Sequence, residues 1–447
     1  MTFNIKVLLG MFVGLLSISA LQAQTTNAEN LSEIYQQALN NSPQYKANLY
    51  TMESTRAQQS VSLGKLLPNL GLATGATLIR KDQTTQSGSY RNYNVGITLT
   101  QMLFDYSSYQ KYQAAKQISY SVEETYNAQK QQFILDVATA YFNVLNAKEQ
   151  VHFLQAKLKA VESALEQAKL KLKVGISTSV DVKVAESNYY NVLASLKAAD
   201  NNVQTTYFAL YQYTGGENKN LADLQEKLHF SNPQPNDINK WIQKAQTNNP
   251  ILKAQVYTQN AAQETLAASN GNFLPNVSLV ANYSINDNSG SNFATGAAGV
   301  PIGNYKNGYI GVTLTWNILN GGSDYATKKQ AAFNYQAAEF TTLNQKRTIK
   351  QNIETDFYTV VSTARQIQAL EQSVLAAEAA YKQYQARFKV GSSTITEVLD
   401  QLQKFYESAS LLASAKYKYI TEVLQLKLDA GTLSEKDVQI FNSWLKS

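Results

Sequence analysis

The 447-residue chain contains no cysteine. This absence excludes disulfide bonds, thiolate metal ligands, a cysteine nucleophile and a lipid anchor on an N-terminal cysteine. Histidine is almost as scarce, with only two residues, and no catalytic triad or metal site is recognisable around them. We therefore expect a protein that is not an enzyme and that holds no metal and no cofactor.

An excess of one charge is also missing. The chain has 39 Lys and Arg against 33 Asp and Glu, for a net charge of +6. The basic residues are scattered rather than clustered, which is typical of solvated helix surfaces. Because nucleic-acid binding requires clustered basic residues, we do not expect a nucleic-acid partner.

Long apolar runs are absent beyond the N-terminus. Residues 7–21 form one apolar run after a short basic start, and a small-residue cleavage site follows it, so residues 1–23 are expected to be a signal peptide. That run is too short for a membrane-spanning helix, and no other segment reaches 18 continuous apolar residues. If the mature protein crosses a membrane, it must do so with strands.

Proline and glycine are sparse, with 7 and 21 residues against 28 tyrosines, which favours long regular elements. Residues 107–173 and 323–389 contain neither proline nor glycine. At about 1.5 Å per residue, each segment predicts a helical rod roughly 100 Å long. Apolar residues recur at a strict 3,4 spacing from Val151 in the first rod and from Ile367 in the second. This period predicts coiled-coil packing.

Three short sequence motifs occur twice, in the same order. LPN lies at residues 67–69 and 274–276, GxTLT at 96–100 and 311–315, and KVG at 173–175 and 389–391. Such recurrence indicates an internal duplication. We expect one structural repeat over residues 24–215 and a second over 238–431, joined by a polar linker at 216–237 and followed by a tail at 432–447.

Each repeat also contains two stretches in which apolar residues alternate with small or polar ones. They predict hairpins at residues 69–103 and 276–319. Strands of about ten residues with one apolar face are typical of a transmembrane β-barrel, although hairpins on a soluble core remain an alternative. Four strands cannot close a barrel, and a bilayer does not tolerate an open edge. Either the hairpins lie on protein or several chains pool their strands.

Two half-length helices flank each rod, at residues 31–66 and 179–213 in the first repeat, and together they match one rod in length. The predicted fold class is therefore an α+β membrane protein, internally duplicated. A long α-helical, coiled-coil tunnel is continued by a transmembrane β-barrel to which each chain contributes four strands.

The chain resembles the TolC-type outer-membrane efflux proteins over about residues 31–431. The resemblance rests on the signal peptide, the duplication and the order of the LPN, GxTLT and KVG motifs. The resemblance implies a homotrimer in outer-membrane lipid, with a tunnel that projects into the periplasm. It further implies a passive exit duct of a tripartite efflux pump or a type I secretion system. Such a duct docks on a periplasmic adaptor protein, which links it indirectly to an inner-membrane transporter.

The Val-Gly pairs at the rod ends, Val174 with Gly175 and Val390 with Gly391, are candidate docking tips. Glycine lets a helix end and turn, and a following Ser or Thr caps the next helix. The resemblance adds that these small residues receive the adaptor.

Acidic residues follow both tips. Asp181 and Glu397 are equivalent in the two repeats and lie in a first helical turn, where the helix dipole stabilises a carboxylate. Asp400 has Val184 as its equivalent, so the repeat does not account for it. Asp400 shares a helix face with Glu397. The resemblance implies that both line a periplasmic constriction, where a ring of carboxylates from three chains favours cations.

One departure from the family concerns closure. The resemblance implies a tyrosine and an arginine around the second tip glycine, and this chain has Phe388 and Ser393 there. The closing network must therefore differ. On the strands, Tyr93, Tyr283, Tyr309 and Trp316 are candidates for an interfacial aromatic girdle, with ordinary barrel packing as the alternative.

An outer-membrane-anchored coiled-coil stalk, such as an adhesin, is the competing function. A stalk needs only one anchor segment, whereas two separated hairpins with helices on both sides suit a tunnel. Because a duct takes its specificity from its transporter, the sequence names neither the cargo nor the transporter class, a resistance-nodulation-division pump or an ABC exporter.

Overall fold

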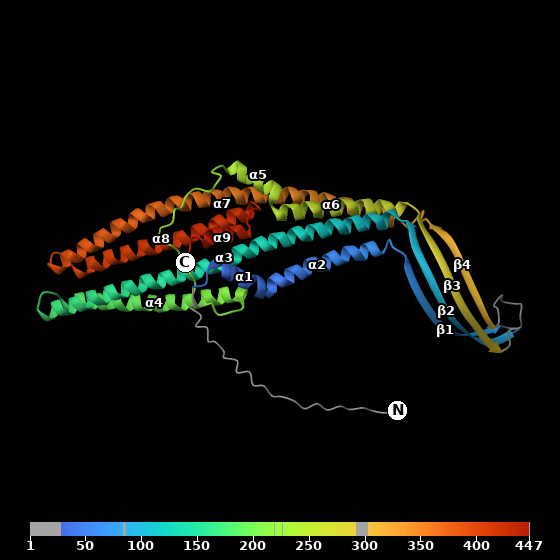
Figure 1. The fold of residues 1–447 in the computed structure, drawn as a ribbon, viewed down its shortest axis with the longest axis horizontal. Helices are drawn as coiled ribbons and strands as arrows, with labels where there is room; N and C mark the ends of the chain where they lie inside the picture. Colours follow the sequence, from blue (N-terminus) through green and yellow to red (C-terminus); the bar gives the residue numbers. More distant parts are fainter. Residues whose placement is uncertain (1–27, 84–85, 219, 226, 292–302, 447) are drawn as a thin grey trace, which may run out of the picture.

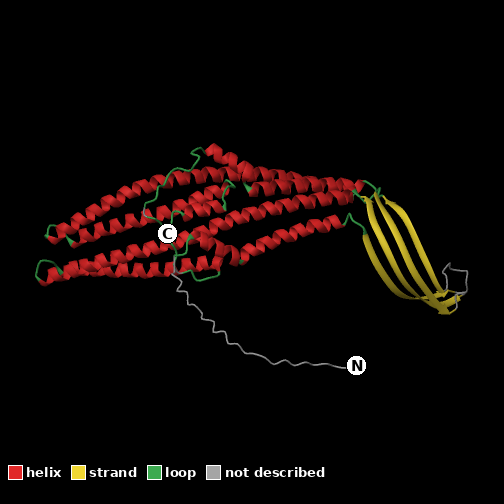
Figure 2. Ribbon diagram, in the orientation of Figure 1, coloured by secondary structure: helices red, strands yellow, loops and turns green. Residues whose placement is uncertain are grey.

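The computed structural model describes residues 28–83, 86–218, 220–225, 227–291 and 303–446. The predicted signal peptide lies outside these residues. The molecule is elongated, with long helices side by side and a sheet at one end (Figures 1 and 2). Within the described ranges, no helix combines the length and the apolarity needed to cross a membrane.

The two predicted rods are present as single helices. Helix α3 spans Tyr106–Lys173 and α7 spans Ser323–Lys389, with 68 and 67 residues. The half-length helices are α2 (Pro43–Gly64), α4 (Ser179–Thr214), α6 (Pro250–Asn270) and α8 (Ile395–Asp429). Helices α2 and α4 pack on α3, and α6 and α8 lie between α3 and α7. The chain thus forms four columns, with α2/α4 and α7 on the outside.

Three short helices, α1 (Leu31–Asn41), α5 (Ile238–Asn248) and α9 (Glu435–Asn442), lie at mid-length of the bundle. The predicted continuous helix at residues 31–66 is wrong, because it breaks at Ser42. Pro43 lacks an N–H and is tolerated only in a first turn. A new helix therefore begins there, capped by the Ser42 hydroxyl, which accepts from the Tyr45 amide at 3.3 Å.

The sheet is antiparallel with the order β1-β2-β3-β4. The strands are β1 (Asn69–Gln83), β2 (Gln86–Phe104), β3 (Asn276–Ser291) and β4 (Gly303–Thr315). They are longer than the roughly ten residues expected. A one-turn 3₁₀ helix, η1 (Gly271–Phe273), precedes β3. Strands β1 and β4 form the two edges, so each pairs on one side only.

The two faces of the sheet differ in polarity. The register aligns Leu72 with Ile97 and Ile97 with Tyr283, so these apolar residues share one face, where Leu72 is 72% exposed. On the opposite face the Asn282 amide donates to the Thr98 hydroxyl at 2.8 Å. Alternation along every strand therefore gives one apolar face and one polar face.

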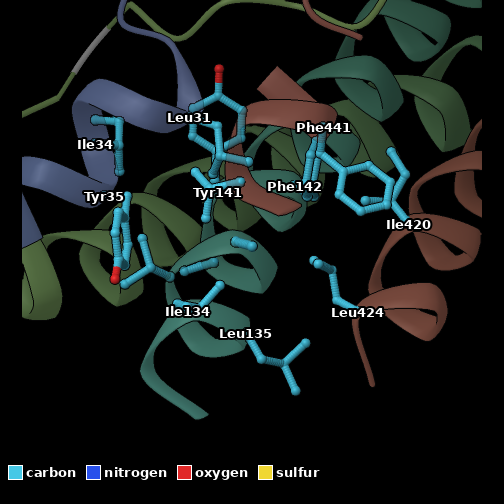
Figure 3. Close-up of a cluster of buried hydrophobic side chains, with 14 of the residues drawn as sticks. Leu31, Ile34, Tyr35, Ile134, Leu135, Tyr141, Phe142, Ile420, Leu424 and Phe441 are labelled. Carbon is cyan, nitrogen blue, oxygen red and sulfur yellow. The ribbon is translucent and has the colours of Figure 1, made fainter. Parts of the chain in front are cut away.

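The largest buried cluster lies where α1, α8 and α9 meet α3 (Figure 3). Tyr141 and Phe142 are fully buried there, and Ile420 from α8 packs beside them. The Tyr141 hydroxyl donates to the Ala222 carbonyl at 2.8 Å, which satisfies a buried polar group. Ala222 belongs to the segment expected to be a linker at residues 216–237. This segment is irregular, but part of it is packed into the core.

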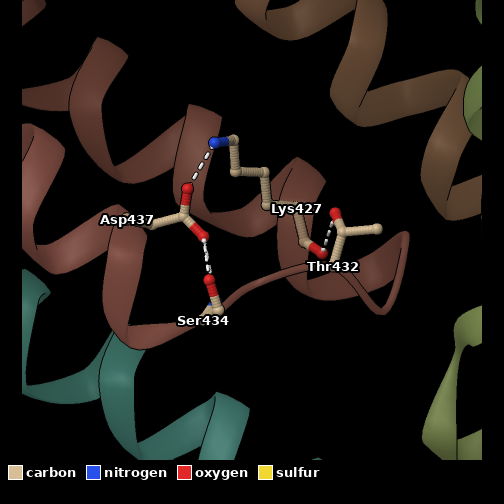
Figure 4. A network of polar contacts seen from close by, with 4 residues as sticks. All are labelled: Lys427, Thr432, Ser434 and Asp437. Atoms are coloured by element: carbon tan, nitrogen blue, oxygen red, sulfur yellow. Dashed lines mark hydrogen bonds and ion pairs between the residues drawn. The ribbon is translucent and has the colours of Figure 1, made fainter.

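Residues after α8 are held by a compact polar network (Figure 4). The Lys427 ammonium donates to the Asp437 carboxylate at 2.5 Å. The other oxygen of Asp437 accepts from the Ser434 amide at 2.9 Å, and the Thr432 hydroxyl donates to the Lys427 carbonyl at 3.3 Å. The network fixes α9 against α8, so the predicted tail at 432–447 includes an ordered helix.

Candidate functional site

Both helical hairpins, α3–α4 and α7–α8, turn at the same end of the molecule, opposite the sheet (Figure 1). In the first turn Gly175 has φ +78°. Its amide donates to the Leu172 carbonyl at 3.0 Å, and the Ile176 amide donates to the Lys171 carbonyl at 2.9 Å. This pair of bonds is a Schellman motif, in which the left-handed residue is normally glycine. Gly391, with φ +79°, ends α7 in the same way.

The tips are apolar and open to solvent. Val174 is 66% exposed, Ile176 is 71% exposed and Val390 is 79% exposed. A Cβ added at either tip glycine would meet no atom within 4 Å. The predicted docking residues therefore lie at the surface, with room for a partner to approach their backbone.

The acids after each tip close capping boxes. Asp181 accepts from the Thr178 amide at 3.0 Å, and Glu397 accepts from the Thr394 amide at 2.7 Å. Each threonine hydroxyl in turn caps the amide of its acid. Hydrogen bonds from these backbone amides hold the pKa of both carboxyls below their usual range. The Glu397 carboxylate thus has a local structural role, whether or not it also lines an opening.

Asp400 differs from Glu397. It lies one turn further along α8, on the exposed face, while Val398 and Leu399 between the two acids are buried. Within the part of the chain that the structure describes, Asp400 makes no hydrogen bond or ion pair. Its carboxylate is therefore available to a neighbouring copy or to a passing ion. The placement of both acids at a constriction stays a prediction.

Phe388 occupies an interior position. It is only 6% exposed and packs with Leu165 of α3 and Leu402 of α8. The Lys171 ammonium donates to the Phe388 carbonyl at 2.5 Å and lies 3.6 Å from the centre of its ring. Ser393 donates to the Tyr384 carbonyl at 3.2 Å. Sequence reasoning missed Lys171, because helical period does not show which carbonyl a last-turn lysine reaches.

The four aromatic residues of the candidate girdle lie at different places on the sheet. Tyr93 and Tyr283 lie on the apolar face and are about half exposed, at 47% and 51%. Tyr309 pairs with Asn282 and therefore lies on the polar face, opposite Tyr93 and Tyr283. Trp316 follows β4, and its indole N–H donates to the Phe273 carbonyl at 3.1 Å, at the helical end of the sheet.

No group of three or more His, Asp or Glu side chains in the described ranges is placed to hold a metal ion.

Comparison with known proteins gives one family. The model of the family described as "Outer membrane efflux protein" matches residues 34–216 and again 241–432. Outer membrane protein TolC of Vibrio cholerae is 33% identical over 419 residues, covering 94% of each chain. The alkaline protease secretion protein AprF of Pseudomonas aeruginosa is 23% identical, over 92% of this chain and 86% of that one.

Solved structures have the same fold. The CmeC outer membrane channel of Campylobacter jejuni superposes with a TM-score of 0.79 at 17% identity, covering 99% of this chain and 98% of that one. At this identity the likeness concerns the fold alone.

Proposed function

The chain belongs to the outer membrane efflux protein family, and we propose that three copies of it build an exit duct, in the outer membrane, for an efflux pump or a secretion system. The names of its relatives, which include a protease secretion protein, support both kinds of system. In this proposal the duct is passive and offers its cargo a path across the membrane.

The observation that carries this proposal is the sheet, which has an apolar face, a polar face and two edges. An apolar face suits lipid and a polar face suits a water-filled lumen. Four strands cannot curl into a closed barrel, and open edges are costly in hydrocarbon. Strand β4 of one copy therefore pairs with β1 of the next, and the strands of three copies close one barrel.

Exposed apolar side chains on the outer columns support the same arrangement. On α7, Phe333 is 57% exposed and Phe340 is 72% exposed. On the opposite column, Tyr50 of α2 and Phe208 of α4 are 70% and 69% exposed. Phe333 and Phe340 are two helical turns apart and so share one face of α7, and exposed apolar surface on one face favours an interface. In the proposed trimer, α7 of one copy packs on α2 and α4 of the next and extends the barrel as a helical tunnel into the periplasm.

The two halves of the chain are proposed to be structural repeats, residues 24–215 and 238–431. Helix lengths support this, since α4 and α8 have 36 and 35 residues, and α2 and α6 have 22 and 21. The family model also matches twice.

The periplasmic partner is proposed to be an adaptor protein that docks on the exposed tips at Val174, Gly175, Val390 and Gly391. The adaptor in turn joins the duct to an inner-membrane transporter. Three copies of Asp400, with Glu397 beside them, form the narrowest and most acidic part of the tunnel.

Vesicle release tests this function. The full chain is reconstituted into lipid vesicles loaded with a small water-soluble dye, with protein-free vesicles as the control. The proposal predicts dye release that scales with the amount of protein and needs no energy source. Retention of the dye at every protein density would refute it.

A further inference from the structure

A groove of about 520 Å³ lies at mid-length of the chain, well away from both tips and sheet. It is lined by α3, the start of α6 and the start of α9, with Tyr35 of α1 in its wall. Among the lining residues only Tyr45, of α2, belongs to an outer column. A volume of this size is in the range of small-molecule sites.

Four charged side chains line this groove, two of each sign. Lys130 and Glu124 come from α3, Lys253 comes from α6, and Glu435 comes from α9. None of the four forms an ion pair within the described residues. The Lys130 ammonium lies 5.3 Å from the centre of the Tyr126 ring, and that aromatic contact leaves its charge unneutralised.

The walls also hold polar groups in fixed positions. The Tyr35 hydroxyl donates to the Glu435 carboxylate at 3.3 Å. The side-chain amide of Gln131 donates to the Gly431 carbonyl at 3.3 Å, while its Oε1 atom is buried and has no hydrogen-bond partner. A buried acceptor without a donor is uncommon and points to a missing partner, such as water or a ligand N–H.

We infer that this groove binds a molecule that carries an ammonium group and a carboxylate group close together. The two lysines suit the carboxylate, whereas the two glutamates and Gln131 Oε1 suit the ammonium. The glutamates would repel a simple anion, and the lysines would repel a simple cation. A ligand with both charges can pair with both sets.

Peptides of the bacterial cell wall carry this amino-carboxylate chemistry, and so do free amino acids. Both sources are compatible with a groove at mid-length of a duct that projects into the periplasm. The site neither opens nor closes the duct, so this inference and the proposed function stand or fall separately.

The test uses the detergent-purified full chain and labelled 2,6-diaminopimelate, which has an ammonium and a carboxylate at each end. Equilibrium dialysis should show saturable binding. Acetylation of the amines or esterification of the acids should abolish it. Lys253→Ala and Glu124→Gln should each weaken binding at least fivefold, whereas Lys253→Arg keeps the charge and should keep binding.

Lys346→Ala, at an exposed lysine of α7 outside the groove, is the matched control and should bind as the unaltered chain does. Co-sedimentation with purified cell walls separates the two sources. If the protein sediments with the walls and the Lys253→Ala variant does not, the ligand is a wall peptide. If the protein binds the soluble probe but does not sediment with the walls, the ligand is a free amino acid. Absence of saturable binding, or binding that none of the groove variants changes, would overturn the inference.

Discussion

Single glycines at helix ends have unequal roles. Gly391 and Gly431 both have positive φ, at +79° and +67°. Around Gly391 the space is open, whereas a Cβ at Gly431 would lie 2.5 Å from backbone atoms of Asn249. Left-handed backbone alone costs a substituted alanine about 1 kcal/mol. At Gly431 the alanine would also force α8 and α6 apart.

We therefore predict that Gly431→Ala lowers the free energy of unfolding at least twice as much as Gly391→Ala does. Chemical denaturation followed by the helical circular dichroism signal measures both. Equal losses would show that the contact with Asn249 relaxes without cost.

A buried carboxyl pair sets a pH dependence. Burial, and after it the nearby carboxylates of Asp429 and Glu422 on α8, together raise the pKa of Asp356 on α7 to about 8. The Lys418 ammonium lies 3.5 Å from the Glu422 carboxylate, and among the described residues no ion pair reaches Asp356 itself. Because the folded pKa exceeds the unfolded one, the folded state binds the extra proton. Stability is highest below about pH 4 for this group and falls as pH rises through 8.

Asp356→Asn should remove this contribution. The variant is expected to melt at a higher temperature than the unaltered chain at pH 9, with a smaller difference at pH 6. Melting curves across this range check the prediction, and parallel curves for the two proteins would contradict it.

Asp400 is the residue whose charge should matter most for ions. In the proposed trimer, Asp400→Asn removes three charges from the narrowest part without changing the helix cap, since the cap belongs to Glu397. Reversal potentials in a salt gradient should then shift toward zero. Val184→Asp adds an acid at the equivalent place in the first repeat and should increase cation preference. Unchanged selectivity in Asp400→Asn would remove this residue from the constriction.

At the scale of elements, the pairing of strand edges between copies can be tested directly with introduced cysteines, because the chain has none of its own. Leu72 lies in β1 and Val312 in β4, with two strands between them. Strands are about 4.8 Å apart, so three strand spacings alone separate these positions by roughly 14 Å within one chain, and the register, which places Gly308 rather than Val312 opposite Leu72, adds to this distance. A disulfide needs Cα atoms within about 7 Å.

The double variant Leu72→Cys/Val312→Cys, oxidised in outer membranes so that disulfides can form, should give covalent species of up to three chains on a denaturing gel. Each single variant is the control and should stay monomeric. Monomers alone in the double variant would mean that β1 and β4 of different copies do not meet.

Elements of the fold could largely be predicted from the sequence, because long segments without proline or glycine and a strict two-residue alternation have few structural solutions. The features that the sequence did not show have local causes. Pro43 interrupts a helix whose apolar period continues on both sides, and period alone does not register that break. Residue type does not show that Tyr309 lies on the face opposite Tyr93 and Tyr283, because the face depends on strand register. Lys171 meets Phe388 only because two hairpins pack together.

At the scale of the whole molecule, one chain leaves several surfaces uncovered. It has a sheet with two open edges, outer helical columns with exposed apolar side chains, and tips with exposed valines. In the proposed assembly, neighbouring copies pair the open edges and cover the apolar side chains of the columns, and a partner covers the valines at the tips. The polar face of the sheet and the exposed Asp400 would then line one continuous path.

Single-channel recording on the purified full chain in a planar bilayer tests this central claim most directly. The account predicts long-lived conductance steps of one uniform size, carried mainly by cations. A folded, membrane-inserted protein that gives no steps would contradict it.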